Sequence, residues 1–263
     1  SNDEIRAALA TGSRRGDFTL VLTGSATKNI GVRRLLDAMV SYLPDPTGIE
    51  RKATALASDE EVVLQADAAG PLVAQVFKTL ADPFVGKLSY FRVYSGAISS
   101  DSRVWNSRVQ EEERVGQVFM VRGKEQTPVS AVKAGDIGVV TKLSVTGTND
   151  TLCERGAPYR VAPVSYPEPL FAVAVFPKTK SDLDKLGSSL NRLVEEDPTL
   201  RIERNVETNE TILWGMGESH IQIAMRRLSQ KFGVDVDVDL PKIPYRETIT
   251  KTNQAQGRHK KQT

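Results

Sequence analysis

Residues 81–106 are the most informative part of this sequence and read ADPFVGKLSYFRVYSGAISSDSRVWN. Asp82, Pro83 and Gly86 predict a turn, after which bulky residues occupy both alternating faces of a strand that Gly96 ends. A second short strand is expected at 103–105. A strand, a turn and a second strand are typical of small β-barrels, and the pattern alone names no function.

Length and composition bound the class of protein. A chain of 263 residues can hold two ordinary domains, because single cores usually need roughly 100 to 200 residues. Its 40% hydrophobic and 26% charged residues are usual for a soluble globular protein. With no long apolar run and no apolar signal core at the start, we expect a cytoplasmic protein without membrane contact. Cys153 is the only cysteine, which excludes an internal disulfide and predicts a small packed residue rather than a reactive thiol.

Residues 1–46 read as the edge of an α/β domain. We expect a helix at 3–14, an apolar β run at 18–22, a small-residue loop at 24–29 and a second helix at 31–42. A segment of about 45 residues is too short for its own core. We therefore expect the rest of that domain to precede residue 1.

The next two segments predict a linker and a barrel. Residues 47–69 are polar apart from one apolar patch and read as a linker. Residues 70–165 show short alternating runs between turn residues and no convincing helix. The expected strands are 73–80, 87–94, 102–105, 115–121, 137–143 and 151–154. Five or six strands at this spacing favour a closed barrel.

Residues 166–242 change character and read β-α-β-β-α-β. Strands are expected at 170–176, 200–204, 211–214 and 234–238, with helices at 179–196 and 218–232. The expected apolar stripe of the first helix is Leu183, Leu186, Leu190, Leu193 and Val194. The stripe of the second helix is Ile221, Met225, Leu228 and Phe232. This order is the ferredoxin-like split unit, in which both helices cover one face of a four-stranded sheet.

No group of residues points to catalysis or to a bound metal. A phosphate-cradling loop of the form G-x-x-x-x-G-K-[ST] is absent from the sequence, so we expect no nucleotide binding of the usual kind. His220 and His259 are far apart and lack the spacing of metal ligands. Ser219 beside His220 is not a nucleophile and base, because neighbours on a helix point about 100° apart. We therefore expect no catalytic residue, no metal ligand and no enzymatic activity in the chain alone.

The net charge of +2 is unevenly distributed. Residues 1–69, 70–165, 166–242 and 243–263 carry −2, +3, −3 and +4. A basic barrel and a basic end would suit contact with a nucleic acid backbone, and solvated surface charge explains the barrel value equally well. The cations of the end segment are Arg246, Lys251, Arg258, Lys260 and Lys261.

Several motifs resemble translation elongation factor G and follow the order of that family. The first, Gly24-Ser25-Ala26, is similar to the last guanine-nucleotide motif of a translational GTPase. Further stretches that resemble sequence motifs of the family are YLPDP at 42–46, PKTK at 177–180, EEDPT at 195–199, GMGESH at 215–220 and PYRETI at 244–249. Ser219 departs from the family, which usually has leucine there.

The resemblance implies that the chain is a fragment of a multi-domain protein of β and α+β class. Its parts would be the end of the GTPase domain at 1–46, a linker at 47–69, the translation-factor β-barrel of domain two at 70–165, the ferredoxin-like domain three at 166–242 and the start of domain four at 243–263. The parent's cofactors would be GTP and Mg²⁺, with Gly24, Ser25 and Ala26 left from the guanine site. No cofactor is expected for the fragment.

The resemblance also implies a function on the ribosome. The parent would couple GTP hydrolysis to translocation of tRNA and mRNA, and would also take part in ribosome recycling. Its partners would be the ribosome, ribosomal RNA and the tRNA–mRNA complex, and we expect a monomer. On the barrel, aromatic neighbours and polar turns make Lys87, Arg92 and Arg103 the expected RNA contacts. In domain three, the expected interdomain relay consists of Gly215, Met216, Gly217, Glu218 and His220.

Two alternatives stay open from the sequence. A ribosomal protection protein uses the same domains to dislodge a bound antibiotic. From a different class, the chain could be an RNA-binding barrel with a ferredoxin-like adaptor and no enzyme attached.

Overall fold

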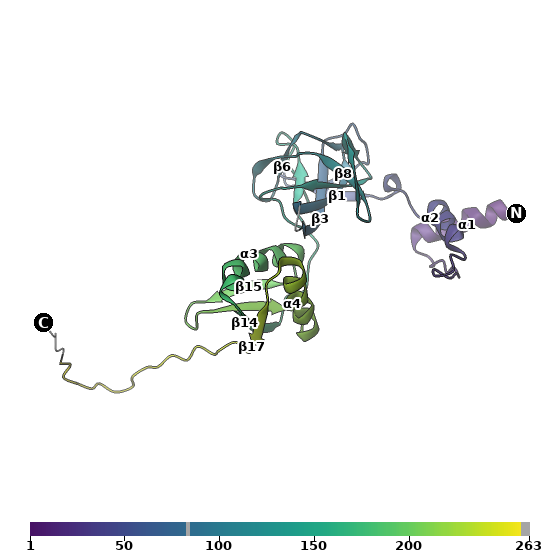
Figure 1. The fold of residues 1–263 in the computed structure, drawn as a ribbon. Helices are drawn as coiled ribbons and strands as arrows, with labels where there is room; N and C mark the ends of the chain where they lie inside the picture. The colour runs from purple at the N-terminus through teal and green to yellow at the C-terminus, as the bar shows by residue number, and fades with distance from the viewer. Residues whose placement is uncertain (83–84, 259–263) are drawn as a thin grey trace. The chain divides into compact units, whose positions relative to one another are not determined.

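A computed structural model describes residues 1–82 and 85–258 of the chain (Figure 1). The chain forms two compact units, Ser1–Ser165 and Tyr166–Thr263. Pro83, His259, Lys260 and Lys261, which the sequence analysis singled out, lie outside the described residues.

Two helices form the start of the first unit. Helix α1 (Asn2–Arg15) begins with a capping box between Ser1 and Glu4 and ends at Gly16, whose φ of 76° is left-handed. Helix α2 spans Val32–Tyr42, as the periodicity predicts. The strand expected at 18–22 is wrong, because none of the described residues pairs with this segment and a strand needs a hydrogen-bonded neighbour.

The segment at 47–69 is a β-hairpin rather than the expected linker. After a short 3₁₀ turn, η1 (Pro46–Gly48), strands β1 (Arg51–Ala55) and β2 (Glu60–Leu64) pair with each other, and β1 also pairs with β13 (Tyr159–Val161). Ala53 and Leu64 are buried with Val73 in a small apolar cluster. The prediction of a linker is wrong. The outward residues of the hairpin are polar and few of its residues are buried, so its sequence resembles that of an exposed linker.

An eight-stranded antiparallel sheet follows, in the order β7-β6-β12-β3-β4-β11-β8-β9. Its strands are β3 (Val73–Asp82), β4 (Gly86–Ser95), β6 (Arg103–Asn106), β7 (Glu111–Arg114), β8 (Val118–Arg122), β9 (Glu125–Val129), β11 (Ile137–Thr141) and β12 (Thr151–Cys153). A separate ladder joins β5 (Ala97–Ser99) to β10 (Ala131–Lys133). All six strands expected from the sequence are present. The short strands β5, β7, β9, β10 and β13 were not expected.

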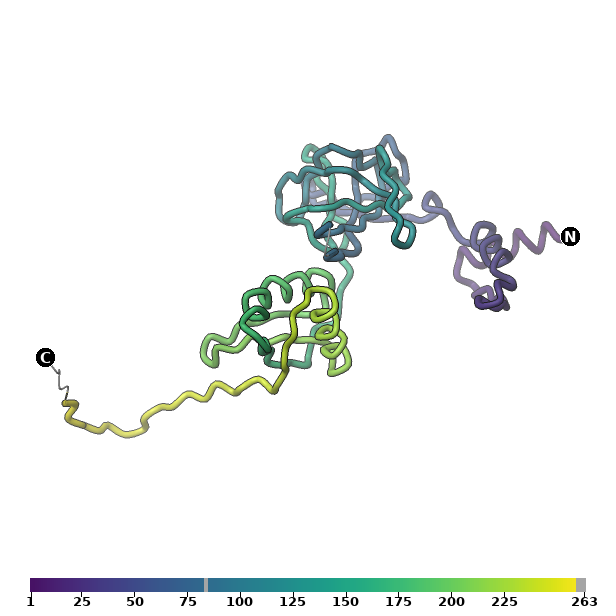
Figure 2. The backbone as a smooth tube through the Cα atoms, viewed as in Figure 1, coloured from purple at the N-terminus to yellow at the C-terminus, as the bar shows by residue number. Residues whose placement is uncertain are grey.

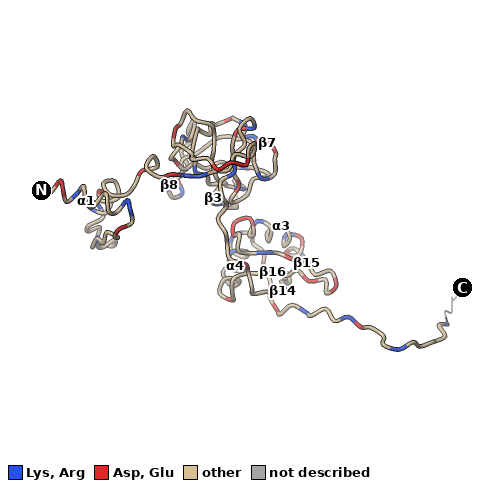
Figure 3. Tube along the Cα trace, turned by 180° about the vertical axis from the view of Figure 1, so that it is seen from behind, with Lys and Arg blue, Asp and Glu red and all other residues tan. Residues whose placement is uncertain are grey.

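The strands wrap around one interior, as the tube in Figure 2 shows, and apolar side chains fill it. The expected closed barrel is wrong, because the sheet stays open. Among the described residues no ladder joins the two ends, β7 and β9. Pro128 removes a backbone donor from β9, and β7 is a run of charged residues that Figure 3 shows in red and blue. Both are typical of edge strands, which explains why closure stops there.

The second unit has the predicted order. Its elements are β14 (Phe171–Pro177), α3 (Lys180–Glu196), β15 (Arg201–Asn205), β16 (Glu210–Gly215), α4 (Glu218–Phe232) and β17 (Val236–Asp239). The antiparallel sheet order β15-β16-β14-β17 confirms the ferredoxin-like unit. Leu186, Leu190, Leu193, Ile221 and Leu228 join the strands in one core cluster.

One expectation for this part of the chain is wrong. Leu183 is 59% exposed and lines an open hollow with Ile202 and Thr211 instead of joining the core stripe. In the segment that resembles the start of domain four, the described residues 243–258 contain neither helix nor strand. None of the described strands pairs with that segment. Within the described part of the chain, no helix is long and apolar enough to cross a membrane.

Candidate functional site

The loop from Gly24 to Ala26 is held by a tight pair of backbone hydrogen bonds. Ser25 donates to the Ile30 carbonyl at 2.9 Å, and Ile30 donates back to Ser25 at 3.0 Å. Glycine is required at both ends, because a Cβ at Gly24 would lie 2.7 Å from the Ile30 oxygen, and Gly31 has a φ of 78°. The loop therefore closes on itself just before α2 begins.

A hollow of about 220 Å³ opens beside this loop. Its lining is Leu22, Thr23, Gly24, Ser25, Ala26, Ile30, Gly31, Val32 and Leu35, and none of these side chains is charged. Backbone amides and small apolar groups can meet a neutral planar ring, whereas a polyphosphate needs cations or a nest of backbone amides. The geometry suits the base of a nucleotide better than its phosphates.

The three basic residues expected on the barrel do not form one patch. Lys87 and Arg92 are five residues apart on β4, so their side chains lie on opposite faces of the strand. Phe91 and Val93 are fully buried in the barrel core, which turns Arg92 outward. Arg103 on β6 is exposed and forms an ion pair with Glu112 at 2.5 Å.

The structure brings Arg51 to Arg92, a pairing that the sequence analysis missed. Arg51 comes from the β1 hairpin, and its guanidinium carbon lies 5.8 Å from the ring centroid of Tyr94. Arg51, Arg92 and Tyr94 line one small hollow. Of the carboxylates in residues 1–82 and 85–258, none forms an ion pair with either arginine. Two uncompensated cations beside an aromatic ring are better placed than Arg103 to receive an anion.

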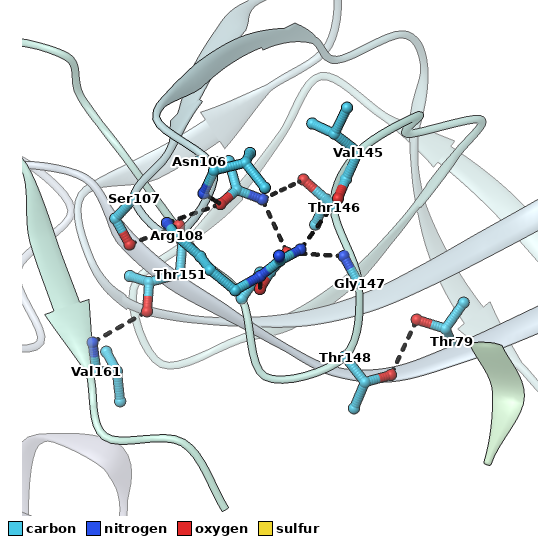
Figure 4. Close-up of polar contacts among 12 residues, drawn as sticks. Thr79, Asn106, Ser107, Arg108, Val145, Thr146, Gly147, Thr148, Thr151 and Val161 are labelled. Carbon is cyan, nitrogen blue, oxygen red and sulfur yellow. Dashed lines mark hydrogen bonds and ion pairs between the residues drawn. The ribbon is translucent and has the colours of Figure 1, made fainter. Parts of the chain in front are cut away.

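A buried polar network holds the loop between β11 and β12. Asp150 is 3% exposed and accepts hydrogen bonds from Arg108 Nε at 2.5 Å and from Asn106 Nδ2 at 2.9 Å. Figure 4 shows the side chains of Asn106 and Arg108 reaching toward Thr146 and Gly147. Burial raises the pKa of Asp150, but the hydrogen bonds from Arg108, Gly147 and Asn106 outweigh it, so the pKa lies below its ordinary value.

Glu113 on β7 holds the same loop from the other side. Its carboxylate accepts from the amides of Ser144, Val145 and Thr146 at 2.5, 2.9 and 3.1 Å, and also from the hydroxyls of Ser144 and Thr146. Burial raises the pKa of Glu113, and these hydrogen bonds lower it to a greater extent. Both carboxylates are saturated with donors, so they order the barrel and are not poised as acids or bases.

The glycine turn between β16 and α4 is bound to the end of α3. The amide of Met216 lies 3.1 Å from Nδ1 of His220, and Nε2 of the same ring lies 3.0 Å from an oxygen of Asp197. The side chains of His220 and Asp197 are only 21% and 23% exposed. His220 therefore lies partly buried at the start of α4, with its imidazole folded back onto the end of α3. With both nitrogens occupied it cannot serve Ser219 as a base.

The remaining relay residues differ in how closely they are packed. A Cβ at Gly215 would lie 2.8 Å from Cδ1 of the buried Ile221, whereas nothing lies within 4 Å of a Cβ at Gly217. The backbone of Gly217 is extended, at φ 168°, which any residue can adopt. Glu218 accepts a hydrogen bond from Gln222 one turn along α4. Of these two glycines, only Gly215 is closely packed, and a side chain there would displace the end of Ile221.

Comparison with known proteins agrees with this architecture. Residues 71–155 match the family described as elongation factor G domain 2, and residues 166–240 match elongation factor G, domain III. The crystal structure of ttk003000868 from Thermus thermophilus is similar over 94% of this chain, with 31% identity and a TM-score of 0.72. The chain spans 34% of the length of that protein chain.

A barrel-like domain followed by this ferredoxin-like unit defines part of a multidomain translation factor. The two consecutive family matches cover most of the chain between residues 71 and 240. The chain belongs to the elongation factor G family and contains its second and third domains.

Proposed function

We propose that the chain is the central part of a translational GTPase that drives ribosomal translocation of tRNA and mRNA. The observation that carries the proposal is the succession of domains 2 and III of elongation factor G in one chain. In the intact cytoplasmic protein, GTP and Mg²⁺ would be held chiefly by parts outside this sequence. The neutral hollow at Gly24–Ala26 would contribute one side of the guanine site.

We propose separate roles for the two described units. The barrel would meet the ribosomal RNA backbone. Arg51 and Arg92, which form no ion pair within residues 1–82 and 85–258, support a phosphate contact there. The ferredoxin-like unit would pass movement between the GTPase domain and domain four, through the turn from Gly215 to Glu218. Ribosome recycling would use the same contacts.

The test uses the full-length protein that contains this chain. Ribosomes should stimulate its GTP hydrolysis, and a pre-translocation complex should advance by one codon when the protein and GTP are added. Matched reactions with a non-hydrolysable GTP analogue control for turnover. Stimulated hydrolysis without codon movement, together with release of a ribosome-bound antibiotic, would instead identify a ribosomal protection protein. An intact protein that binds RNA but shows no GTPase activity would identify a non-enzymatic adaptor.

A further inference from the structure

The contacts of His220 determine which of its nitrogens carries the proton. The amide of Met216 is a donor and lies 3.1 Å from Nδ1, so Nδ1 must present its lone pair. In the neutral ring the proton then lies on Nε2, which is 3.0 Å from the carboxylate of Asp197 and can donate to it. A single imidazole therefore joins a backbone donor on one side to an acceptor on the other.

Asp197 is itself fixed, so it can serve as an anchor. It is the residue that follows α3, and its second oxygen accepts from the amide of Thr199 at 3.0 Å and from the Thr199 hydroxyl at 2.5 Å. Burial raises the pKa of Asp197, but the hydrogen bonds from Thr199 and His220 outweigh burial and lower it. The carboxylate is accordingly ionised at neutral pH and available as the acceptor.

The Gly215–Gly217 turn, which lies on the Nδ1 side of the imidazole, has few other stabilising contacts at Met216 and Gly217. Met216 is 42% exposed, and Gly217, the N-cap of α4, supplies no side-chain cap. A position without packing or a cap has many accessible backbone conformations. The hydrogen bond from Met216 to His220 thus selects one of them.

We propose that His220 is a positioning residue that fixes the Gly215–Gly217 turn to the end of α3. Its neutral imidazole, protonated at Nε2, sets the Met216 amide relative to Asp197. The pairing joins two stretches that the sequence analysis singled out separately, at 195–199 and 215–220. The consequence for translocation rests on the proposed function, whereas the positioning of the turn belongs to this chain alone.

Two substitutions in the 263-residue chain test the two ring nitrogens of His220 one at a time. His220→Asn places an amide oxygen where Nδ1 was, so it keeps the acceptor for Met216 and loses contact with Asp197. His220→Gln places an amide nitrogen where Nε2 was, so it keeps the donor to Asp197 and leaves the Met216 amide unpaired. Ser219→Ala is the matched control, because Ser219 is the exposed neighbour on the same helical turn.

Nuclear magnetic resonance of the chain gives the first readout. The imidazole ¹⁵N shifts should show a protonated Nε2 and an unprotonated Nδ1. Amide exchange at Met216 should accelerate by about tenfold or more in His220→Gln, the effect of losing one hydrogen bond. Exchange should stay close to wild type in Ser219→Ala and accelerate less in His220→Asn. A proton on Nδ1 in the neutral ring, or unchanged Met216 exchange in His220→Gln, would overturn the positioning role.

The second readout uses the same variants in full-length protein. We expect His220→Gln to slow ribosomal translocation, with His220→Asn nearer to wild type and intrinsic nucleotide affinity unchanged. Wild-type translocation by His220→Gln, despite an unprotected Met216 amide, would remove the functional part of the inference. If the wild-type protein itself does not translocate, the proposed function fails, while amide exchange still decides what His220 does.

Discussion

Replacing Glu113 by glutamine should destabilise the barrel far more than its position on an edge strand suggests. Glu113 is 6% exposed and accepts five hydrogen bonds from residues 144–146. The glutamine side chain has an NH₂ group in place of one carboxylate oxygen. At least one N–H group of the loop then faces a donor and loses its acceptor. A buried unsatisfied donor costs about 1–3 kcal/mol, and losing the carboxylate charge weakens the other bonds by about 1 kcal/mol in total. We therefore expect a loss of about 2–4 kcal/mol in the free energy of unfolding.

The unfolding of the unit that contains the barrel can be measured separately, because each unit contains one tryptophan. Trp105 lies in the first unit and Trp214 in the second, so a Trp214→Phe background leaves Trp105 fluorescence as the probe of urea unfolding. Glu112→Gln is the matched control. Its side chain is 36% exposed and pairs with Arg103 at the surface, so it should cost less than about 1 kcal/mol. A Glu113→Gln loss no larger than the Glu112→Gln loss would refute the argument.

The same network predicts how barrel stability changes with pH. The pKa values of Glu113 and Asp150 are lowered in the folded chain, so folding is favoured above their ordinary values. That contribution should be lost as pH falls from about 5 to below 3, through the folded pKa values. Urea midpoints measured across this range should fall less steeply in Glu113→Gln, which lacks one of the two groups. A parallel decline in both proteins would contradict the assignment.

Three further predictions follow from the other sites. Replacing Arg51 and Arg92 together by glutamine should reduce the magnitude of the slope of log RNA affinity against log salt concentration by about 1–2. Arg103→Gln should leave that slope nearly unchanged, and fluorescence anisotropy with labelled RNA can measure both. Gly215→Ala should lower the free energy of unfolding of the second unit by about 1 kcal/mol through overpacking, whereas Gly217→Ala should change it by less than about 0.5 kcal/mol, as measured by Trp214 fluorescence. Isothermal titration should detect no GTP binding to the 263-residue chain, and micromolar affinity would show that the loop at 24–26 suffices without a phosphate site.

Local pattern by itself determined most of the regular structure. The start of β4 at Gly86 and its end just before Gly96 follow from turn residues around an alternating run. The order of the ferredoxin-like unit follows from the change between a repeat of two and a repeat near 3.6 residues, both of which are properties of short segments. Short strands such as β5 and β10 contain three residues each, too few for a periodicity to be read. The apolar run at 18–22 shows the opposite case, since a local pattern makes no strand without a partner.

Only the tertiary structure decided which functional side chains meet. Arg51 reaches Tyr94 and the hollow that it shares with Arg92, because β1 pairs with β13 beside β3 and β4. His220 meets Asp197, 23 residues away in the sequence, because two helices pack on one face of a sheet. Such contacts depend on the closure of long chain segments and on burial in a shared core, and neither leaves a periodic signal in the residues that make the contact.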